Sequence, residues 1–210
     1  NTVKFCEGNT LTLNAQNPGC TYLWNTGETT QIIDVTSGGK YWVTLSNECG
    51  TITDTVEAIV ESPLFDLELG NDTIICEGEN LVLDTKYPNA TTKWQDGSSL
   101  QTFTVNQTGL YYVKISNTCG NWSDSIYVEV LGTPVFSLGS DTTICGIDGS
   151  LNLTGPPGYN QYLWSTGETT PEILVNQHGF YHLTVSNQCF SYTDTIEVIP
   201  EYPLIVDLGP

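Results

Sequence analysis

The chain has 210 residues, with 24 acidic and only five basic side chains and a formal net charge of −19 at pH 7. This balance argues against binding to nucleic acids or anionic membrane surfaces, because both require basic patches. It fits a solvated extracellular protein and is compatible with divalent cations. The sequence contains no signal peptide and no apolar run long enough to span a membrane.

One stretch of sequence recurs three times with a period of about 70 residues. The tryptophans at 24, 94 and 164 and the tyrosines at 41, 111 and 181 each lie 70 residues apart. A fixed internal period indicates tandem repeats. We predict three repeats at 1–62, 63–133 and 134–202. The first lacks an opening strand, and 203–210 (LIVDLGP after Pro203) is predicted to open a further repeat. We therefore expect the chain to be part of a longer array.

Within a repeat, short segments with a period of two predict strands. In the second repeat these segments are 64–69, 81–83, the residues around Trp94, 103–105, 111–116 and 125–130. Asp96-Gly97 is typical of a hairpin turn. No segment has a helical period. We predict an all-β protein of three tandem immunoglobulin-like β-sandwich repeats in an elongated array, with the recurrent Trp and Tyr in the cores.

Cysteines recur with the same period. Each repeat carries one cysteine before its first core strand and one after its Tyr-bearing strand: Cys6 and Cys49, Cys76 and Cys119, Cys145 and Cys189. A domain of this size has a modest core and usually needs a cross-link. We expect each pair to close its own repeat, with a loop of about 43 residues contributing roughly 4 kcal/mol. The alternative is reduced core cysteines.

Cys20 has no counterpart in the other repeats. It could compete with Cys6 for Cys49, or remain unpaired. Disulfides would place the protein in an oxidising compartment.

The joints between repeats are short and contain proline. They read Glu61-Ser62-Pro63, Gly132-Thr133-Pro134 and Glu201-Tyr202-Pro203. Proline fixes its own φ and restricts the residue before it. We therefore expect semi-rigid connections between the repeats.

No catalytic arrangement recurs. The only histidines, His178 and His182, both lie in the third repeat, and no nucleophile, phosphate-loop or metalloprotease motif is present. We predict that the chain is not an enzyme and requires no cofactor.

Calcium is the one cofactor that the sequence suggests. Aspartates recur beside the glycine of each opening segment (64–70 in the second repeat and 135–139 in the third) and in the last strand: Asp54, Asp66, Asp72, Asp124, Asp141 and Asp194. Clustered oxygen ligands near domain junctions suit Ca²⁺. The alternative is that these carboxylates form turns and aid solubility.

Three aromatic residues are candidates for stacking on sugar rings: Trp42, Tyr112 and Trp122. Trp42 and Tyr112 occupy the position in their repeats that His182 occupies in the third. Cross-strand packing that protects the sheet is the favoured alternative.

The motifs LGNDT-I-IC, YLW-x-TGETT, G-x-Y-x-V-x-x-S-N-x-C-G and T-D-T-I-x-V cover the whole chain. This set resembles the Ig-like/PKD-like repeats of large Bacteroidota surface proteins, including gliding-motility adhesins exported by the type IX system. The resemblance implies a stalk on the outer cell surface and paired cysteines at the six matching positions. It also implies O-glycosylation of the Asp-Ser/Thr motif at Thr55, Thr73, Ser125, Thr142 and Thr195.

The function expected from sequence is therefore a structural stalk of a bacterial adhesin. Its expected partners are its own neighbouring repeats, and surface polysaccharide or other surface proteins. The alternatives are carbohydrate-binding modules and an accessory region of a secreted hydrolase.

Overall fold

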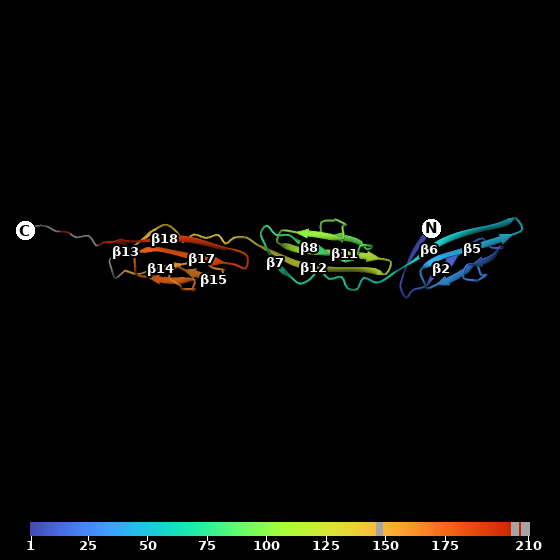
Figure 1. Ribbon diagram of the computed structural model, residues 1–210, viewed down its shortest axis with the longest axis horizontal. Coiled ribbons are helices and arrows are strands. Elements are labelled where there is room, and N and C mark those ends of the chain that lie inside the picture. The colour runs from blue at the N-terminus through green and yellow to red at the C-terminus, as the bar shows by residue number, and fades with distance from the viewer. Residues whose placement is uncertain (146–148, 203–205, 207–210) are drawn as a thin grey trace, which may run out of the picture. The chain divides into compact units, whose positions relative to one another are not determined.

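The computed structural model describes residues 1–145, 149–202 and 206 (Figure 1). These residues form eighteen strands and no helix. The part of the chain that is described thus contains no helix able to cross a membrane. The predicted fold class is confirmed: the chain is all-β, with the same pair of sheets recurring three times.

Each repeat contains a four-stranded and a two-stranded sheet. In the first repeat the orders are β1-β6-β5-β3 and β2-β4; in the second, β7-β12-β11-β9 and β10-β8; in the third, β13-β18-β17-β15 and β14-β16. The strands of the first repeat are β1 (Thr2–Cys6), β2 (Leu11–Asn14), β3 (Thr21–Trp24), β4 (Ile32–Val35), β5 (Gly39–Asn47) and β6 (Gly50–Glu61). Those of the second are β7 (Thr73–Cys76), β8 (Leu81–Asp84), β9 (Thr91–Trp94), β10 (Thr102–Val105), β11 (Gly109–Asn117) and β12 (Gly120–Leu131). Those of the third are β13 (Thr142–Cys145), β14 (Leu151–Thr154), β15 (Gln161–Trp164), β16 (Glu172–Val175), β17 (Gly179–Ser186) and β18 (Ser191–Glu201).

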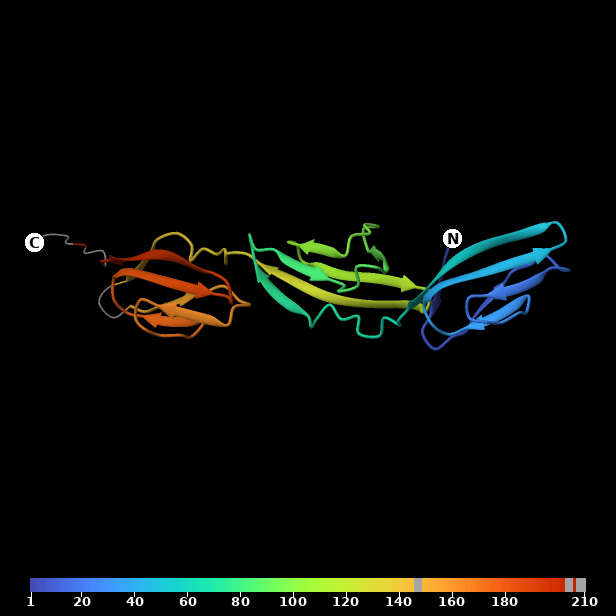
Figure 2. The same ribbon diagram turned by 45° about the vertical axis from the view of Figure 1, so that its right-hand side comes forward.

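The core of each repeat lies between its two sheets, which face each other in Figure 2. Alternate residues of the long strands point inward, so Val113 and Ile115 are buried while Tyr112 and Lys114 face solvent. The three recurrent tryptophans are buried, as predicted. Each tryptophan donates its indole N–H to a backbone carbonyl six residues further on, at 2.9 Å, which satisfies the one polar atom of the ring.

Two local predictions were wrong. Residues 64–69 form no strand: the N–H of Leu69 bonds to the Asp124 carboxylate and that of Asp66 to the Tyr87 hydroxyl, and neither bonds to a neighbouring strand. The turn at Asp96-Gly97 does form, with Gly97 at φ 87°. It does not close a hairpin, however, since β9 pairs with β11 and β10 pairs with β8. The predicted opening strand at 203–210 lies outside the described residues, except for Val206.

By Cα proximity the chain divides into two compact units. The first comprises Asn1–Asp72, Val82–Val105 and Gly109–Tyr127, and the second comprises Thr73–Leu81, Asn106–Thr108 and Val128–Pro210. The division passes through the second repeat. Each joint described below lies entirely within one unit.

Candidate functional site at the joints between repeats

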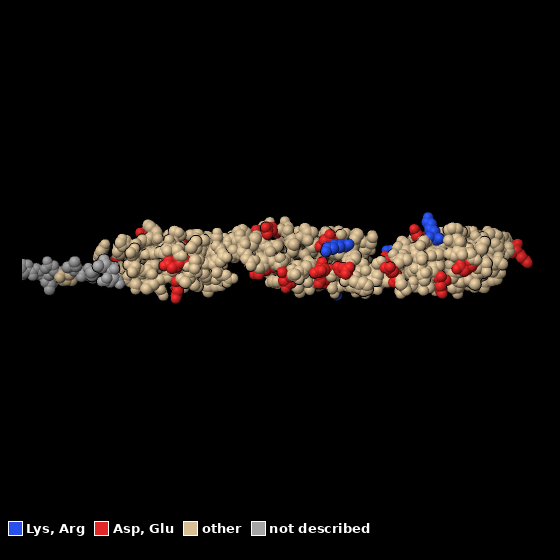
Figure 3. Space-filling view, turned by 60° about the horizontal axis from the view of Figure 1, so that its bottom comes forward, with Lys and Arg blue, Asp and Glu red and all other residues tan. Residues whose placement is uncertain are grey.

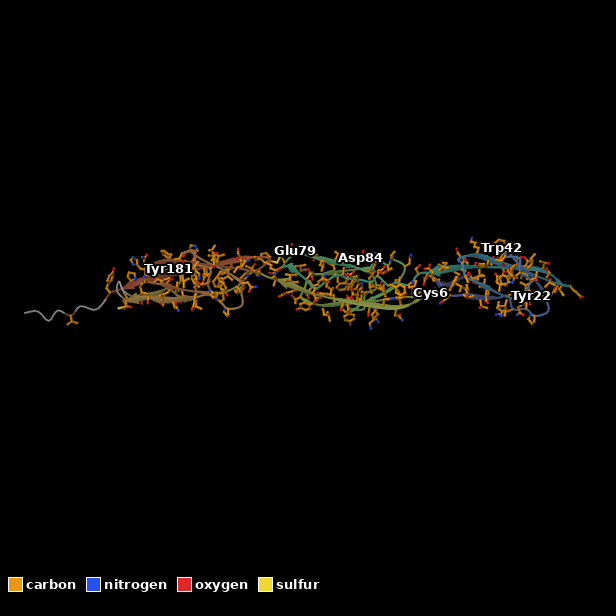
Figure 4. All side chains as sticks on the ribbon, turned by 90° about the horizontal axis from the view of Figure 1, so that it is seen from below. Cys6, Tyr22, Trp42, Glu79, Asp84 and Tyr181 are labelled. Atoms are coloured by element: carbon orange, nitrogen blue, oxygen red, sulfur yellow. A yellow bond between two sulfur atoms is a disulfide. The ribbon has the colours of Figure 1, made fainter. Side chains whose placement is uncertain are left out.

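The first cysteine of each repeat lies where that repeat ends. The short first strand runs parallel to the last strand, and the register places Cys6 opposite Glu61. The same register places Cys76 opposite Leu131, and Cys145 opposite Glu201. The joint to the next repeat begins directly after these partners. Figure 4 labels Cys6 at one end of the first repeat.

The second cysteine of each repeat lies in the turn between the two longest strands. An asparagine side chain shapes this turn. The Oδ1 atoms of Asn47, Asn117 and Asn187 accept the N–H of the cysteine two residues later, at 2.8, 2.9 and 2.8 Å. This local hydrogen bond is the usual way in which asparagine stabilises a turn.

The disulfides join consecutive repeats. Cys6 bonds to Cys119 and Cys76 bonds to Cys189, each across 113 residues of sequence. The Cα–Cα distances of 4.8 and 5.4 Å lie in the normal range for a disulfide. The first bond lies within the first compact unit and the second within the second unit.

The expectation that each repeat is closed by its own disulfide is therefore wrong. Four of the six expected cysteines are bonded, but to other partners, while Cys49 and Cys145 are exposed free thiols. The reason is strand length. β6 has 12 residues and at about 3.3 Å per residue is roughly 35–40 Å long. Cys6 lies beside its last residue and Cys49 just before its first, so the two cannot meet.

Cys20 is also unbonded. It packs against the core of the first repeat. Its sulfur lies 3.9 Å from the Asn47 amide nitrogen.

The same turn asparagine also holds the joint by a hydrogen bond. Asn117 donates its Nδ2 proton to the carbonyl of Ser62 at 2.8 Å, in the first unit. Asn187 donates in the same way to the carbonyl of Gly132 at 2.8 Å, in the second unit. At each joint, one residue of the following repeat thus shapes the turn that carries the cysteine and binds the linker backbone.

The first joint also contains a charged cluster around Glu61. Lys4 Nζ lies 2.7 Å from Glu61 Oε1, and the N–H and hydroxyl of Thr118 both donate to Oε2 at 2.9 Å. The hydrogen bond from Lys4, followed by that from the Thr118 N–H, lowers the pKa of Glu61 from 4.5 to about 2. Both groups favour the charged carboxylate. The second joint has Leu131 at the position of Glu61.

Five of the six aspartates predicted to bind calcium accept backbone hydrogen bonds. Asp124 accepts the N–H of Leu69 at 2.6 Å, and Asp194 accepts that of Leu138 at 2.7 Å. The bond from Leu138 lowers the pKa of Asp194. Asp72 accepts the N–H of Tyr127 and Asp141 accepts that of Glu197. These four aspartates therefore fix the opening segments or first strands.

Asp54 accepts the N–H of its chain neighbour Thr55, and Asp66 lies exposed in the opening segment. Across 1–145, 149–202 and 206, no three His, Cys, Asp or Glu side chains gather as metal ligands would. Calcium binding stays a prediction, tested below. Acidic side chains are spread along the face seen in Figure 3.

The candidate sugar-stacking residues lie in two different settings. Trp42 and Tyr112 are 44% and 43% exposed, and they lie on different repeats. Trp42 and Tyr22 are labelled on opposite sides of the first repeat in Figure 4. Trp122 instead packs edge-on against Phe65, with ring centroids 6.1 Å apart. It therefore covers the opening segment, so only the first two rings remain open for stacking.

The predicted glycosylation positions all lie on strands. Thr55, Ser125 and Thr195 are exposed within the long last strands, whereas Thr73 and Thr142 are half-buried at the first residues of β7 and β13. Their modification stays a prediction.

No protein-family model and no curated protein matches the chain. Solved structures of tandem immunoglobulin domains do match its fold. A Glu-to-Ala variant of a three-Ig titin fragment has a TM-score of 0.58 at 17% identity, and a titin I-band fragment has 0.54 at 18%. Each alignment covers 95% of both chains. At this identity the similarity shows the fold: three immunoglobulin-like domains in tandem.

Proposed function

We propose that these repeats are a non-catalytic spacer in a secreted or cell-surface protein. The observation that carries this proposal is the covalent bond between consecutive repeats. A cross-link that served only the stability of a small domain would lie within the repeat. A bond from one repeat to the next restricts how the two can separate and rotate.

The joints support the same proposal. Each combines a short proline-containing linker, a disulfide and a hydrogen bond from the turn asparagine to the linker backbone. Proline and the disulfide remove backbone freedom, while the hydrogen bond fixes the linker against the next repeat. Such joints suit a segment whose role is to hold other domains at a distance.

The chemistry of the chain supports the proposed cellular setting. Disulfides persist in oxidising compartments, and the net charge of −19 keeps a long chain soluble. Together with the resemblance to Bacteroidota repeats, this favours a stalk on the outer cell surface. An adhesin, including one used in gliding motility and exported by the type IX system, is the proposed parent protein. Its proposed partners are adjacent repeats and surface polysaccharide or other surface proteins.

Force spectroscopy tests the mechanical proposal. A Cys76→Ser, Cys145→Ser double variant keeps only the bond from Cys6 to Cys119, which closes 113 residues. We expect reduction to add roughly 370–410 Å to the contour length gained on forced unfolding, because the closed segment can then extend. A gain of about 150 Å would indicate a bond within one repeat. No gain would contradict the proposal.

Carbohydrate binding is the second candidate, favoured by the exposed rings of Trp42 and Tyr112. The same binding would suit an accessory region of a secreted hydrolase. A glycan array with the chain tests it. Saturable binding that is lost in Trp42→Ala but kept in the control Leu23→Ala, which removes another exposed apolar side chain of the first repeat, would contradict a purely structural role.

A further inference from the structure

A pocket of about 530 Å³ lies at the first joint, between the end of the first repeat and one loop of the second. One wall comes from Lys4 on β1 and from residues 59–64, where β6 ends and the linker leads into the second repeat. The other wall comes from residues 87–90, in the loop between β8 and β9, and from Asn117 of β11. All of these residues belong to the first compact unit. A pocket of this size suits a small ligand, and such pockets form preferentially where two domains meet.

Hydrogen bonds hold this loop in place before any ligand binds. Asp84 (labelled in Figure 4) accepts the N–H of Lys86 at 2.8 Å, and Lys86 has a left-handed φ of 62°. The N–H of Ala90 donates to the carbonyl of Tyr87 at 3.2 Å, and the hydroxyl of Tyr87 accepts the N–H of Asp66 at 3.3 Å. The Tyr87 ring is therefore fixed against the opening segment. A preformed wall lowers the entropic cost of binding.

The opposite wall carries a hydrogen-bond donor beside an acceptor. Lys4 Nζ lies 2.7 Å from Glu61 Oε1, and across the described part of the chain Glu61 is the only partner of this ammonium group. Two of the three ammonium protons therefore remain for a ligand, and Glu61 Oε1 keeps a lone pair. On the loop, Asn89 adds an exposed amide that supplies both a donor and an acceptor.

These groups match the hydroxyl groups of a neutral sugar. A hydroxyl both donates and accepts, so two neighbouring hydroxyls can bind the Lys4 ammonium and the Glu61 carboxylate side by side. The charges of this pair cancel, and the net charge of −19 on the chain repels an anionic ligand. The apolar atoms of Tyr87 and Pro88 suit the C–H face of a pyranose ring.

We propose that this joint pocket binds one neutral pyranose unit of a saccharide. The sugar ring stacks on Tyr87 and Pro88 of the second repeat. Two of its neighbouring hydroxyls bind Lys4 and Glu61 of the first repeat, so the ligand contacts both repeats. The proposal rests neither on the spacer function nor on the exposed ring of Trp42.

The chemistry of this pocket is specific to the first joint. At the second joint Ile74 stands at the position of Lys4. Leu131 stands at the position of Glu61, and Pro157 replaces the tyrosine ring of the loop. The second joint therefore has neither the ion pair nor the aromatic ring at these positions, and we expect no sugar to bind there.

An NMR titration of the full chain with the methyl glycosides of glucose, galactose and mannose tests the site. We expect at least one of them to shift the amide resonances of Lys4, Ala90 and Asn117 in a saturable way, with a dissociation constant in the millimolar range. The uronic acid of the same sugar, which adds a carboxylate, should bind at least about tenfold more weakly. Shifts with none of the three glycosides, or equal binding of the uronic acid, would overturn the proposal.

Variants of the chain locate the binding. Tyr87→Ala should abolish the shifts. Asn89→Ala, which removes an exposed side chain that holds no part of the fold, should weaken binding about fivefold. Tyr127→Ala is the matched control, because it removes an exposed tyrosine outside the pocket and should leave binding unchanged. Equal losses in the two tyrosine variants, or a loss in Trp42→Ala in place of Tyr87→Ala, would overturn the proposed site.

Discussion

The two joints contain the same disulfide and the same asparagine hydrogen bond but differ in charge. At the first, Glu61 forms an ion pair with Lys4 of its own repeat and accepts a hydrogen bond from Thr118 of the next. At the second, Leu131 stands in its place, and the Asn187 bond to Gly132 is unchanged. The elements found at both joints are therefore the ones that define the connection, and the ion cluster is an addition specific to the first.

The largest effect that tests this comparison is loss of a disulfide. We expect Cys6→Ser and Cys76→Ser each to lower the free energy of unfolding by up to about 4.7 kcal/mol, because each bond closes a loop of 113 residues. Chemical denaturation measures this.

Cys49→Ser and Cys145→Ser are the matched controls, since both thiols are exposed and unbonded. They should leave the free energy of unfolding within about 0.5 kcal/mol of its original value. If Cys49→Ser lowered the free energy of unfolding as much as Cys6→Ser does, the result would indicate a Cys6–Cys49 bond within the repeat.

The asparagine contribution should be smaller, and somewhat larger at the second joint, where Asn187 Oδ1 also accepts the N–H of Phe190 at 2.8 Å. Asn117→Ala and Asn187→Ala each remove the bond to the cysteine N–H and the bond to the linker carbonyl, which together are worth about 1–2 kcal/mol. Asn47→Ala, which loses the same turn bond in the first repeat, provides the baseline. If all three variants lose equal stability, the linker bonds contribute nothing.

The charged cluster should matter only at the first joint. Glu61 has a folded pKa of about 2, below its ordinary 4.5. Its contribution is therefore fully present above about pH 4.5 and is lost as the pH falls towards 2. We expect Glu61→Gln to cost about 1 kcal/mol at neutral pH, a value reduced by solvent screening of Lys4, and almost nothing near pH 2.

Denaturation curves of Glu61→Gln and the original chain at the two pH values check this sign. Glu201→Gln, at the equivalent position of the third repeat, serves as the control. A penalty that persists at low pH would show that the cluster acts through packing and not through charge.

Calcium should give the smallest effect. Because most of the candidate aspartates already accept backbone hydrogen bonds, we expect millimolar Ca²⁺ to raise the melting temperature by only about 1–2 °C. Differential scanning calorimetry with and without a chelator measures it. An unchanged melting temperature would contradict calcium binding.

The strand pattern was readable from sequence because it depends on local alternation and on a repeated core. The period of two over 111–116 predicts Tyr111, Val113 and Ile115 on one face, and the structure buries the latter two. The opening segments were misread because Phe65, Leu67 and Leu69 also alternate. Their backbone, however, bonds to an aspartate 55 residues further on, and no local pattern reveals such a partner.

The disulfide pairing could not be read from spacing, because Cys76 lies 43 residues before Cys119 in sequence yet at the opposite end of the long last strand of its own repeat. One signal was available. The second cysteine follows the Tyr-bearing strand, at the end of a 9-residue strand and before a 12-residue strand. Because β7 pairs in parallel with β12, the length of β12 keeps Cys76 away from Cys119. The parallel pairing, however, is a tertiary contact that the local sequence pattern does not indicate.

Peptide mapping of the native, unreduced protein by mass spectrometry tests the central claim most directly. We predict linked peptides that join Cys6 to Cys119 and Cys76 to Cys189. Peptides that join Cys6 to Cys49, Cys76 to Cys119 and Cys145 to Cys189 would contradict a covalent connection between consecutive repeats.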